Sequence, residues 1–309
     1  MERTDPFKTE ILRLEQLTKC TIGLSAIHLP TLRSIGYRVN RHFLLCSTYK
    51  IPIAVCLLKK VERKELTLEH LYTILESDLR SGMISTLNQL QYSTPVTMSV
   101  LNLLQFMLQE SCNTASDIVL RLIGGPKAVM LFLQEISVND LRVDRFTLEI
   151  MADSDGIDIN DLSQDYTLEK YKLLENKISL ENKKIAREKF KTDVRDKGTP
   201  DAMSKLLILI KTNKVLAQDH STLLLKIMQR CKTGPQRIMG LLPMGLRVSH
   251  KTGTATGYTN DVGIVYLPEN QGEIALSVYV EHFEQSANVA ERLIAEATRN
   301  VIDYFLFQP

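Results

Sequence analysis

Short runs of β-branched and other apolar residues lie near both ends of this chain, and longer apolar stretches with helical periodicity lie between them. The pattern constrains the fold, because strands from both ends can share one sheet only if the helices form an insertion. It predicts an α/β sandwich whose sheet joins the termini, with a helical subdomain inserted in the middle. The predicted strands are 22–27, 37–40, 43–45, 246–248, 262–267 and 274–280. The predicted helices are 7–20, 47–60, 98–107, 114–122, 201–210, 221–228 and 288–307, and 65–140 is expected to be mostly helical.

Composition excludes several classes of function. The net charge of +2 over 309 residues gives no electrostatic case for binding nucleic acid or a membrane surface. No apolar run approaches the roughly 18 residues that span a bilayer. No signal peptide is visible, so we expect a cytosolic protein or a mature form with an added start methionine. The five cysteines are scattered and include no C-x-x-C pair, which argues against zinc and a disulfide framework. We expect no cofactor and no metal.

A serine and a lysine open the first strongly apolar helix, in the string Ser47-Thr48-Tyr49-Lys50. A helix that begins near Ser47 places Lys50 one turn later on the same face. Burial lowers the pKa of a lysine, which can then act as a general base for a neighbouring hydroxyl. The alternative is a helix N-cap serine followed by a snorkelling lysine.

Two later strings complete a set whose order and spacing indicate one acyl-transfer site. They are Ser111-Cys112-Asn113 and Lys251-Thr252-Gly253-Thr254. The first supplies a hydroxyl and an amide between two apolar helices, although an ordinary connecting turn would use the same residues. The second supplies a cation, a hydroxyl and a glycine where a strand must let a ligand approach its backbone, and the alternative is a simple edge strand.

The segment 168–191 is about half charged, with apolar residues at helical spacing. It predicts one amphipathic surface helix with a narrow apolar stripe. The stripe consists of Tyr171, Leu174, Ile178 and Ile185. One interpretation is a solvated helix packed on its own domain, and the other is a lid or a contact with a protein partner.

With Phe43-Leu44-Leu45-Cys46 before Ser47, and Gly240-Leu241-Leu242-Pro243 before Lys251, the ordered set resembles the class A serine β-lactamases and their penicillin-binding relatives. The resemblance runs from about residue 20 to the C-terminus, apart from the charged insert. It implies the serine β-lactamase/DD-peptidase fold. In that fold an antiparallel sheet formed by both chain ends is flanked by helices and carries an all-helical subdomain. It also implies one domain, 1–309, with a sheet lobe (1–46 and 246–309), a helical lobe (47–245) and an atypical omega loop (152–195).

The resemblance assigns roles to four catalytic residues. It implies that Ser47 is the acylated nucleophile and Lys50 its base, that Ser111 relays a proton to the leaving nitrogen, and that Lys251 steadies Ser111 and attracts the substrate carboxylate. The other site residues would bind substrate. They are Asn113 for the side-chain amide, Thr252 and Arg237 for the carboxylate, Gly253 in the strand, and Thr254, whose N–H would complete the oxyanion hole with that of Ser47.

The chain departs from the family pattern in the omega loop. Asp144-Arg145-Phe146 is followed by Thr147, where the family has the glutamate that activates water for deacylation. The family's asparagine position is Met151. Further departures are Cys112 in the second string and His250 before the third. Arg145 and Asp196 are expected to clamp the loop, and Asn260-Asp261 also match the family.

Three functions follow from this pattern. The first is a β-lactamase-like serine hydrolase with slow or unusual deacylation, using Glu149, Asp153 or Asp155 as a substitute base. The second is a penicillin-binding/DD-peptidase-like protein that takes a peptidoglycan-like peptide. The third is a non-catalytic binding protein that uses 168–191 as its contact. We expect a monomer, and the resemblance implies a periplasmic or secreted protein.

Overall fold

The computed structural model describes residues 5–82, 94–162 and 166–307. They form two compact units. The first consists of Met1–Val55, Leu133–Arg142 and Asp196–Pro309, and the second of Cys56–Phe132 and Val143–Arg195. Residues 196–245, which the sequence analysis assigns to the helical lobe, therefore lie in the unit that contains the sheet.

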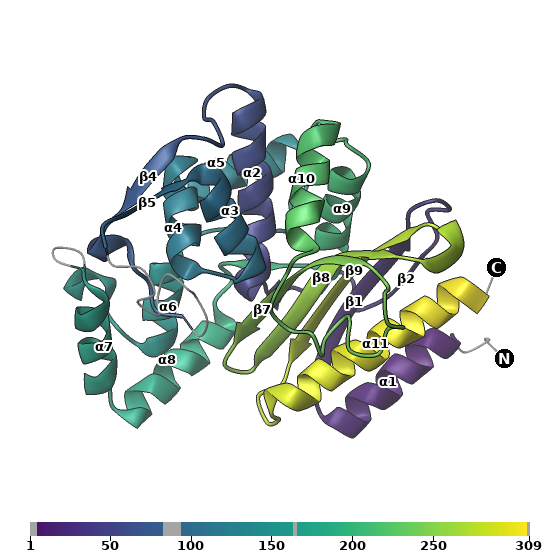
Figure 1. The fold of residues 1–309 in the computed structure, drawn as a ribbon. Coiled ribbons are helices and arrows are strands. Elements are labelled where there is room, and N and C mark those ends of the chain that lie inside the picture. The colour runs from purple at the N-terminus through teal and green to yellow at the C-terminus, as the bar shows by residue number, and fades with distance from the viewer. Residues whose placement is uncertain (1–4, 83–93, 163–165, 308–309) are drawn as a thin grey trace. The chain divides into compact units, whose positions relative to one another are not determined.

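An antiparallel sheet of five strands is the centre of the first unit, in the order β2-β1-β9-β8-β7 (Figure 1). The strands are β1 (Thr21–His28), β2 (Ser34–Tyr37), β7 (Val248–Ala255), β8 (Tyr258–Tyr266) and β9 (Glu273–Glu281). Strand β1 pairs with β9 along its whole length, from Thr21 opposite Glu281 to His28 opposite Ile274. Both chain ends thus contribute to one antiparallel sheet, which confirms the predicted fold class.

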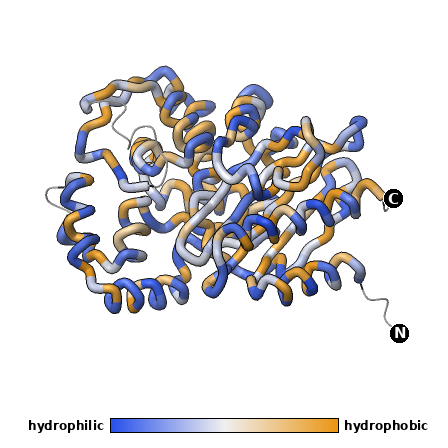
Figure 2. The backbone as a smooth tube through the Cα atoms, turned by 60° about the horizontal axis from the view of Figure 1, so that its bottom comes forward, coloured by the Kyte–Doolittle hydropathy of each residue, from blue (hydrophilic) through white to orange (hydrophobic). Residues whose placement is uncertain are grey.

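Helices cover both faces of this sheet. Helices α1 (Pro6–Thr18) and α11 (Ala287–Phe307) lie side by side on one face (Figure 1), and their apolar side chains share a core with the strands. Figure 2 shows hydrophobic and hydrophilic residues alternating along the helix that ends at the C-terminus, as a helix with one buried face requires. Helix α9 (Pro200–Lys211) packs on β1, β8 and β9, and α10 (Gln218–Met228) packs on β7.

Two short elements support the segment that leads to Ser47. Strand β3 (Phe43–Leu44) pairs with β6 (Lys197–Gly198). It is followed by the short 3-10 helix η1 (Cys46–Tyr49) and then by α2 (Lys50–Glu62), whose residues 51–58 are all buried.

The second unit contains most of the helices. Besides the later part of α2 it holds α3 (Val100–Gln109), α4 (Asn113–Leu122), most of α5 (Gly125–Glu135), α6 (Thr147–Asp155), α7 (Leu168–Lys177) and α8 (Leu180–Thr192). Short 3-10 helices are η2 (Glu76–Asp78) and η3 (Ile159–Asp161) here, and η4 (Pro268–Asn270) in the first unit.

Several predicted elements differ in detail from the structure. The predicted strand 246–248 overlaps β7 only at Val248. The stretch 65–140 contains α3, α4 and α5, and also two paired strands that the sequence did not predict, β4 (Leu71–Ile74) and β5 (Val96–Ser99). Helix α3 begins after Met98, because the Ser99 hydroxyl accepts a hydrogen bond from the Asn102 N–H and caps the helix there. The strand predicted at 37–40 ends at Tyr37, since Arg38 has a left-handed backbone (φ 49°) that turns the chain.

The charged segment forms two helices rather than the single predicted helix. Helix α7 ends before Ile178, whose backbone is extended, and the Ser179 hydroxyl caps α8 by accepting from the Asn182 N–H. Tyr171, Leu174 and Ile178 belong to a small apolar cluster with α6, which supports the interpretation that this segment packs on its own unit. Within 5–82, 94–162 and 166–307, no helix is both long and apolar enough to cross a bilayer.

Candidate functional site

Ser47 lies in the 3-10 helix η1, one residue after its start. In such a helix the side chains of residues three apart eclipse each other, so Ser47 and Lys50 lie on one edge. The backbone N–H of Lys50 donates to the carbonyl of Ser47, which fixes this geometry. Ser47 is half-buried, whereas Lys50 is completely buried. The structure therefore supports a same-face arrangement, but through a tighter helix than the predicted α-helix.

The residue before the serine has an unusual backbone. Cys46 is in the left-handed region with φ 47°, which costs a residue with a Cβ roughly 1–3 kcal/mol. Such strain persists only when surrounding contacts hold it in place, and it is enriched at functional sites.

The sheet supplies those contacts. The Asn260 side-chain amide on β8 donates to the carbonyls of Leu44 (2.9 Å) and Leu45 (3.2 Å), and its oxygen accepts from the Val280 N–H on β9. The hydroxyl of Tyr279 lies 3.5 Å from that of Thr48. Asn260 is almost fully buried, so it fastens the chain just before the serine to the centre of the sheet.

Gly253 allows β7 to lie against the serine turn. A Cβ at this position would come within 2.8 Å of the Leu45 carbonyl oxygen and 2.9 Å of the Cys46 Cβ. From the sequence, this glycine is expected to let a ligand approach the strand backbone. The close approach in the structure is made by the chain's own backbone at the turn that carries Ser47.

Lys251 on β7 is completely buried, and its ammonium donates to the Thr252 carbonyl at 2.8 Å. Burial lowers its pKa to about 8, although the charges of Cys231 and Asp261 oppose this effect. The lysine is therefore cationic at neutral pH and loses its charge in mildly alkaline solution.

The Arg237 side chain is hydrogen-bonded to the C-terminal part of β7 and to β8. Its guanidinium donates to the carbonyls of Gly253 (3.0 Å) and Asn260 (2.9 Å) and to the Thr254 hydroxyl (2.8 Å), and its Nε pairs with Glu291. Four of its five N–H groups are thus engaged, so at most one remains for a ligand. This geometry makes Arg237 a support for Thr254.

Ser111 and Asn113 lie in the second unit, where α3 ends and α4 begins. Ser111 has a left-handed backbone (φ 59°), the same unusual conformation as Cys46. Cys112 is completely buried and caps α4, its Sγ accepting from the Ala115 N–H. The Asn113 side chain donates to the Ser81 carbonyl at 2.9 Å and contacts the Met151 sulfur at 3.6 Å.

Thr147 begins α6, where a buried carboxylate binds the helix N-terminus. Asp117 accepts from the backbone N–H groups of Thr147 (2.7 Å) and Leu148 (3.2 Å), and pairs with Arg80 at 2.8 Å. A carboxylate at this end of a helix satisfies orphan N–H groups and complements the dipole.

The three substitute bases considered in the sequence analysis all have protein partners. Glu149 accepts from the Phe146 N–H at 2.7 Å and so caps α6, and Asp155 accepts from the Tyr171 hydroxyl at 2.6 Å. Asp153 pairs with Arg145 and Arg195. Each carboxylate therefore has a role in stabilising the loop.

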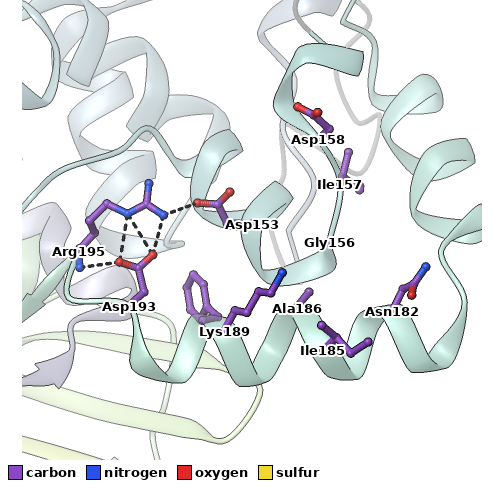
Figure 3. A pocket seen from close by; sticks show the side chains of 11 residues that line it. Asp153, Gly156, Ile157, Asp158, Asn182, Ile185, Ala186, Lys189, Asp193 and Arg195 are labelled. Carbon is purple, nitrogen blue, oxygen red and sulfur yellow. Dashed lines mark hydrogen bonds and ion pairs between the residues drawn. The ribbon is translucent and has the colours of Figure 1, made fainter.

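Asp153 belongs to an ionic cluster at the end of the insert. Figure 3 shows Arg195 directed toward the carboxylates of Asp193 and Asp153, beside a pocket lined by α8. Burial raises the pKa of Asp193, but the hydrogen bonds of Arg195 and the charges of Arg145 and Arg195 outweigh it and lower the pKa to about 2. Arg145 also lies 3.2 Å from Asp193. Its pairing with Asp196 stays a prediction.

The predicted residues fall into two groups. Ser47, Lys50, Arg237 and the string 251–254 are in the first unit, and Ser111 and Asn113 are in the second. The supporting roles of Tyr279 and Asn260 were not predicted from the sequence, although the Asn260-Asp261 match was a signal. Within the part of the chain that the structure describes, no cluster of three or more His, Cys, Asp or Glu residues could hold a metal ion.

Comparison with known proteins identifies the family. The model of the Beta-lactamase enzyme family matches residues 6–305. The imipenem-hydrolyzing β-lactamase of Enterobacter cloacae is 28% identical, over 95% of this chain and 88% of its own length. β-Lactamase VEB-1 of Pseudomonas aeruginosa is 25% identical, over 98% and 92%.

Solved structures agree. The class A β-lactamase of the last common ancestor of Gram-negative bacteria is 26% identical, with a TM-score of 0.79 over 97% of this chain and 100% of that chain. A β-lactamase from Chitinophaga pinensis has the same fold, with a TM-score of 0.79 at 24% identity over 97% and 99%. The chain therefore belongs to the β-lactamase enzyme family. It is a serine hydrolase of the class A type.

Proposed function

We propose that this protein forms an acyl-enzyme with β-lactams at Ser47 and releases the acyl group slowly. The observation that carries the proposal is the serine turn: a half-buried Ser47 eclipsed by a completely buried Lys50, with strand β7 lying against the turn at Gly253. A buried lysine beside a serine activates the hydroxyl, and a strained turn held by the sheet keeps it oriented.

In the proposed reaction Lys50 takes the proton of the Ser47 hydroxyl as its oxygen attacks the β-lactam carbonyl. The N–H groups of Ser47 and Thr254 stabilise the oxyanion, and Ser111 returns a proton to the leaving ring nitrogen. Lys251 and Thr252 hold the substrate carboxylate, and Asn113 holds the side-chain amide. The roles of Ser111 and Asn113 rest on the family motif.

The acyl group is expected to leave slowly because the omega loop lacks the glutamate that activates water in the family. Thr147 occupies the position of the water-activating glutamate, and a threonine hydroxyl is not a base at neutral pH. Glu149, Asp153 and Asp155 are engaged by Phe146, by arginines and by Tyr171. Loss of a positioned base typically slows a step by about 10²–10⁴-fold. Slow release also favours a second candidate, a penicillin-binding-type protein whose natural acyl donor is a peptide.

The proposal is tested by intact mass spectrometry after addition of benzylpenicillin, followed over hours, together with nitrocefin hydrolysis. We expect an adduct on Ser47 that persists while hydrolysis is slow. A stable adduct with no hydrolysis would favour the penicillin-binding candidate. Absence of both would overturn the proposal and leave a binding protein, whose contact through 168–191 would be sought next. A periplasmic or secreted location stays a prediction from the family.

Acylation by a carboxylate-bearing penicillin is expected to lose rate as the pH rises through about 8. Burial lowers the Lys251 pKa to about 8, so the deprotonated form, which lacks the charge that attracts the carboxylate, predominates above that pH. The second-order rate constant should fall up to about tenfold per pH unit. The methyl ester of the same penicillin is the control, because it lacks the carboxylate. An equal fall for acid and ester would assign the titration to another group.

A further inference from the structure

Cys231, His250 and Asp261 form a Cys–His–Asp cluster at strand β7, the strand that carries Lys251 and Thr252. The proposed acylation chemistry does not use this cluster. His250 on β7 is almost fully buried, and its Nδ1 lies 2.8 and 3.0 Å from the two carboxylate oxygens of Asp261 on β8. Cys231, in the segment between α10 and β7, lies near enough to His250 for each side chain to shift the pKa of the other. A carboxylate that orients an imidazole beside a thiol is the arrangement that activates cysteine nucleophiles.

The charges of this cluster favour a thiolate–imidazolium pair. Burial raises the Cys231 pKa, but hydrogen bonding to His250 and the positive charges of His250 and Lys251 outweigh it and lower the pKa to about 6. Burial lowers the His250 pKa, but the charge and hydrogen bond of Asp261 outweigh it and raise the pKa to about 10. Arg237 adds a further positive charge near Lys251.

Exposure and charge together distinguish Cys231 from the other four cysteines. Cys20, Cys56 and Cys112 are buried, whereas Cys46 and Cys231 are partly exposed. Although part of the Cys46 residue is exposed, its thiol is buried, which raises its pKa to about 12 and keeps it protonated. Reactive cysteines are those that combine thiolate character with access, and only Cys231 does so among these five.

The hydroxyls of Thr233 and Thr252 connect the Cys231 sulfur to strand β7. The Thr233 hydroxyl lies 3.3 Å from the Cys231 sulfur and 2.5 Å from the Thr252 hydroxyl. When the sulfur is a thiolate, Thr233 donates to it and accepts from Thr252. A group added to the sulfur removes this acceptor and crowds Thr233, so it must disturb the orientation of Thr252.

We propose that Cys231 is a modification site for soft electrophiles, namely small disulfides and alkylating agents. Its modification disturbs Thr252, which holds the substrate carboxylate, and thereby lowers the rate at which Ser47 is acylated. The first part rests on the cluster of Cys231, His250 and Asp261, and the second rests on the proposed function. With a disulfide, the Cys231 sulfur attacks one sulfur, the S–S bond breaks, and the other sulfur leaves as a thiolate. Cys231 is thereby oxidised to a mixed disulfide, and half of the reagent is reduced to a thiol.

Iodoacetamide tests the first part, since this small neutral reagent alkylates thiolates and releases iodide. The labelling rate, measured by mass spectrometry with peptide mapping, should be half-maximal near pH 6. At about pH 5, Cys231 should react at least about tenfold faster than an ordinary cysteine, because its larger thiolate fraction outweighs its lower intrinsic nucleophilicity. The comparison at acidic pH is diagnostic, because at neutral pH the two factors nearly cancel.

Two variants sharpen this experiment. His250→Gln removes the imidazolium and should move the midpoint of labelling to about pH 8 or above. Cys231→Ser should remove the label while Cys46 stays unlabelled. A wild-type profile with an ordinary thiol midpoint, or faster labelling at Cys46, would overturn the assignment. The wild-type profile decides the matter even where His250→Gln fails to fold.

The second part is measured on fully labelled protein, as the rate at which benzylpenicillin acylates Ser47. We expect about a tenfold loss relative to unlabelled protein, since small displacements of a positioning group are costly. Cys231→Ser protein treated with the same reagent is the control for labelling elsewhere. Complete labelling with an unchanged acylation rate would refute the link to Thr252. If untreated protein forms no adduct on Ser47, the proposed function fails, whereas the labelling result stands by itself.

Discussion

Replacement of Lys50 by methionine is expected to slow acylation of Ser47 by benzylpenicillin by about 10²–10⁴-fold, the usual cost of removing a positioned general base. Lys50 is completely buried and eclipses Ser47 along the 3-10 turn, so no water can take its place as proton acceptor without a rearrangement. Methionine has a similar length and no charge, which makes it the least disruptive replacement in a buried site. The measurement is the rate of adduct formation by intact mass, with the thermal midpoint recorded in parallel.

Lys59→Met is the matched control for this prediction. Lys59 lies near the far end of the same helix α2, where it pairs with Glu62 at 3.0 Å. The same substitution there should leave acylation within about twofold of wild type, because a partly exposed ion pair contributes little. Wild-type acylation in a folded Lys50→Met protein would contradict the role of Lys50 as the base.

Replacement of Asn260 by leucine is expected to cost about 2–4 kcal/mol of unfolding free energy and to reduce acylation at least about tenfold. The change removes the amide partner of the Leu44 carbonyl and of the Val280 N–H, and leaves the Leu45 carbonyl with the Thr48 hydroxyl and N–H. The left-handed Cys46 then loses a contact that helps to hold it, so Ser47 is less well oriented. Denaturant unfolding and the acylation rate are measured on the same preparation.

Asn288→Ala provides the comparison, since Asn288 is exposed at the start of α11. Surface substitutions of this kind usually change stability by less than about 0.5 kcal/mol. If Asn260→Leu were destabilised but acylated Ser47 at the wild-type rate, Asn260 would be a stabilising residue without influence on the serine turn.

Much of the fold could be predicted from the sequence, because local patterns report local structure. The apolar periodicity of 288–307 and 201–210 matched α11 and α9, and the β-branched runs 262–267 and 274–280 matched β8 and β9 to within a few residues, whereas the run 246–248 meets β7 only at Val248. The strands β4 and β5 were not predicted, and two other errors lie where a single residue ended an element. Ser179 divided the charged segment into two helices, and Arg38 turned the chain after β2.

The candidate site also has features that could be predicted from the sequence and features that could not. The order and spacing of Ser47, Lys50, Ser111 and Lys251 predict a catalytic site, and the position after Asp144-Arg145-Phe146 predicts that Thr147 replaces the family glutamate; both stay predictions. The engagement of Glu149, Asp153 and Asp155 could not be predicted, because their partners depend on how the loop folds.

The sequence by itself determined the set of reactive groups, since residue type and spacing fix which hydroxyls, amines and carboxylates the chain carries. Only the tertiary structure decided what those groups are able to do. Strand β7 meets the serine turn at Gly253, Arg237 donates to two strand carbonyls and to Thr254, and His250 pairs with Asp261 near Cys231. These contacts join residues distant in the chain, and burial and charge set the pKa values of Lys251 and Cys231 only once the sheet has formed.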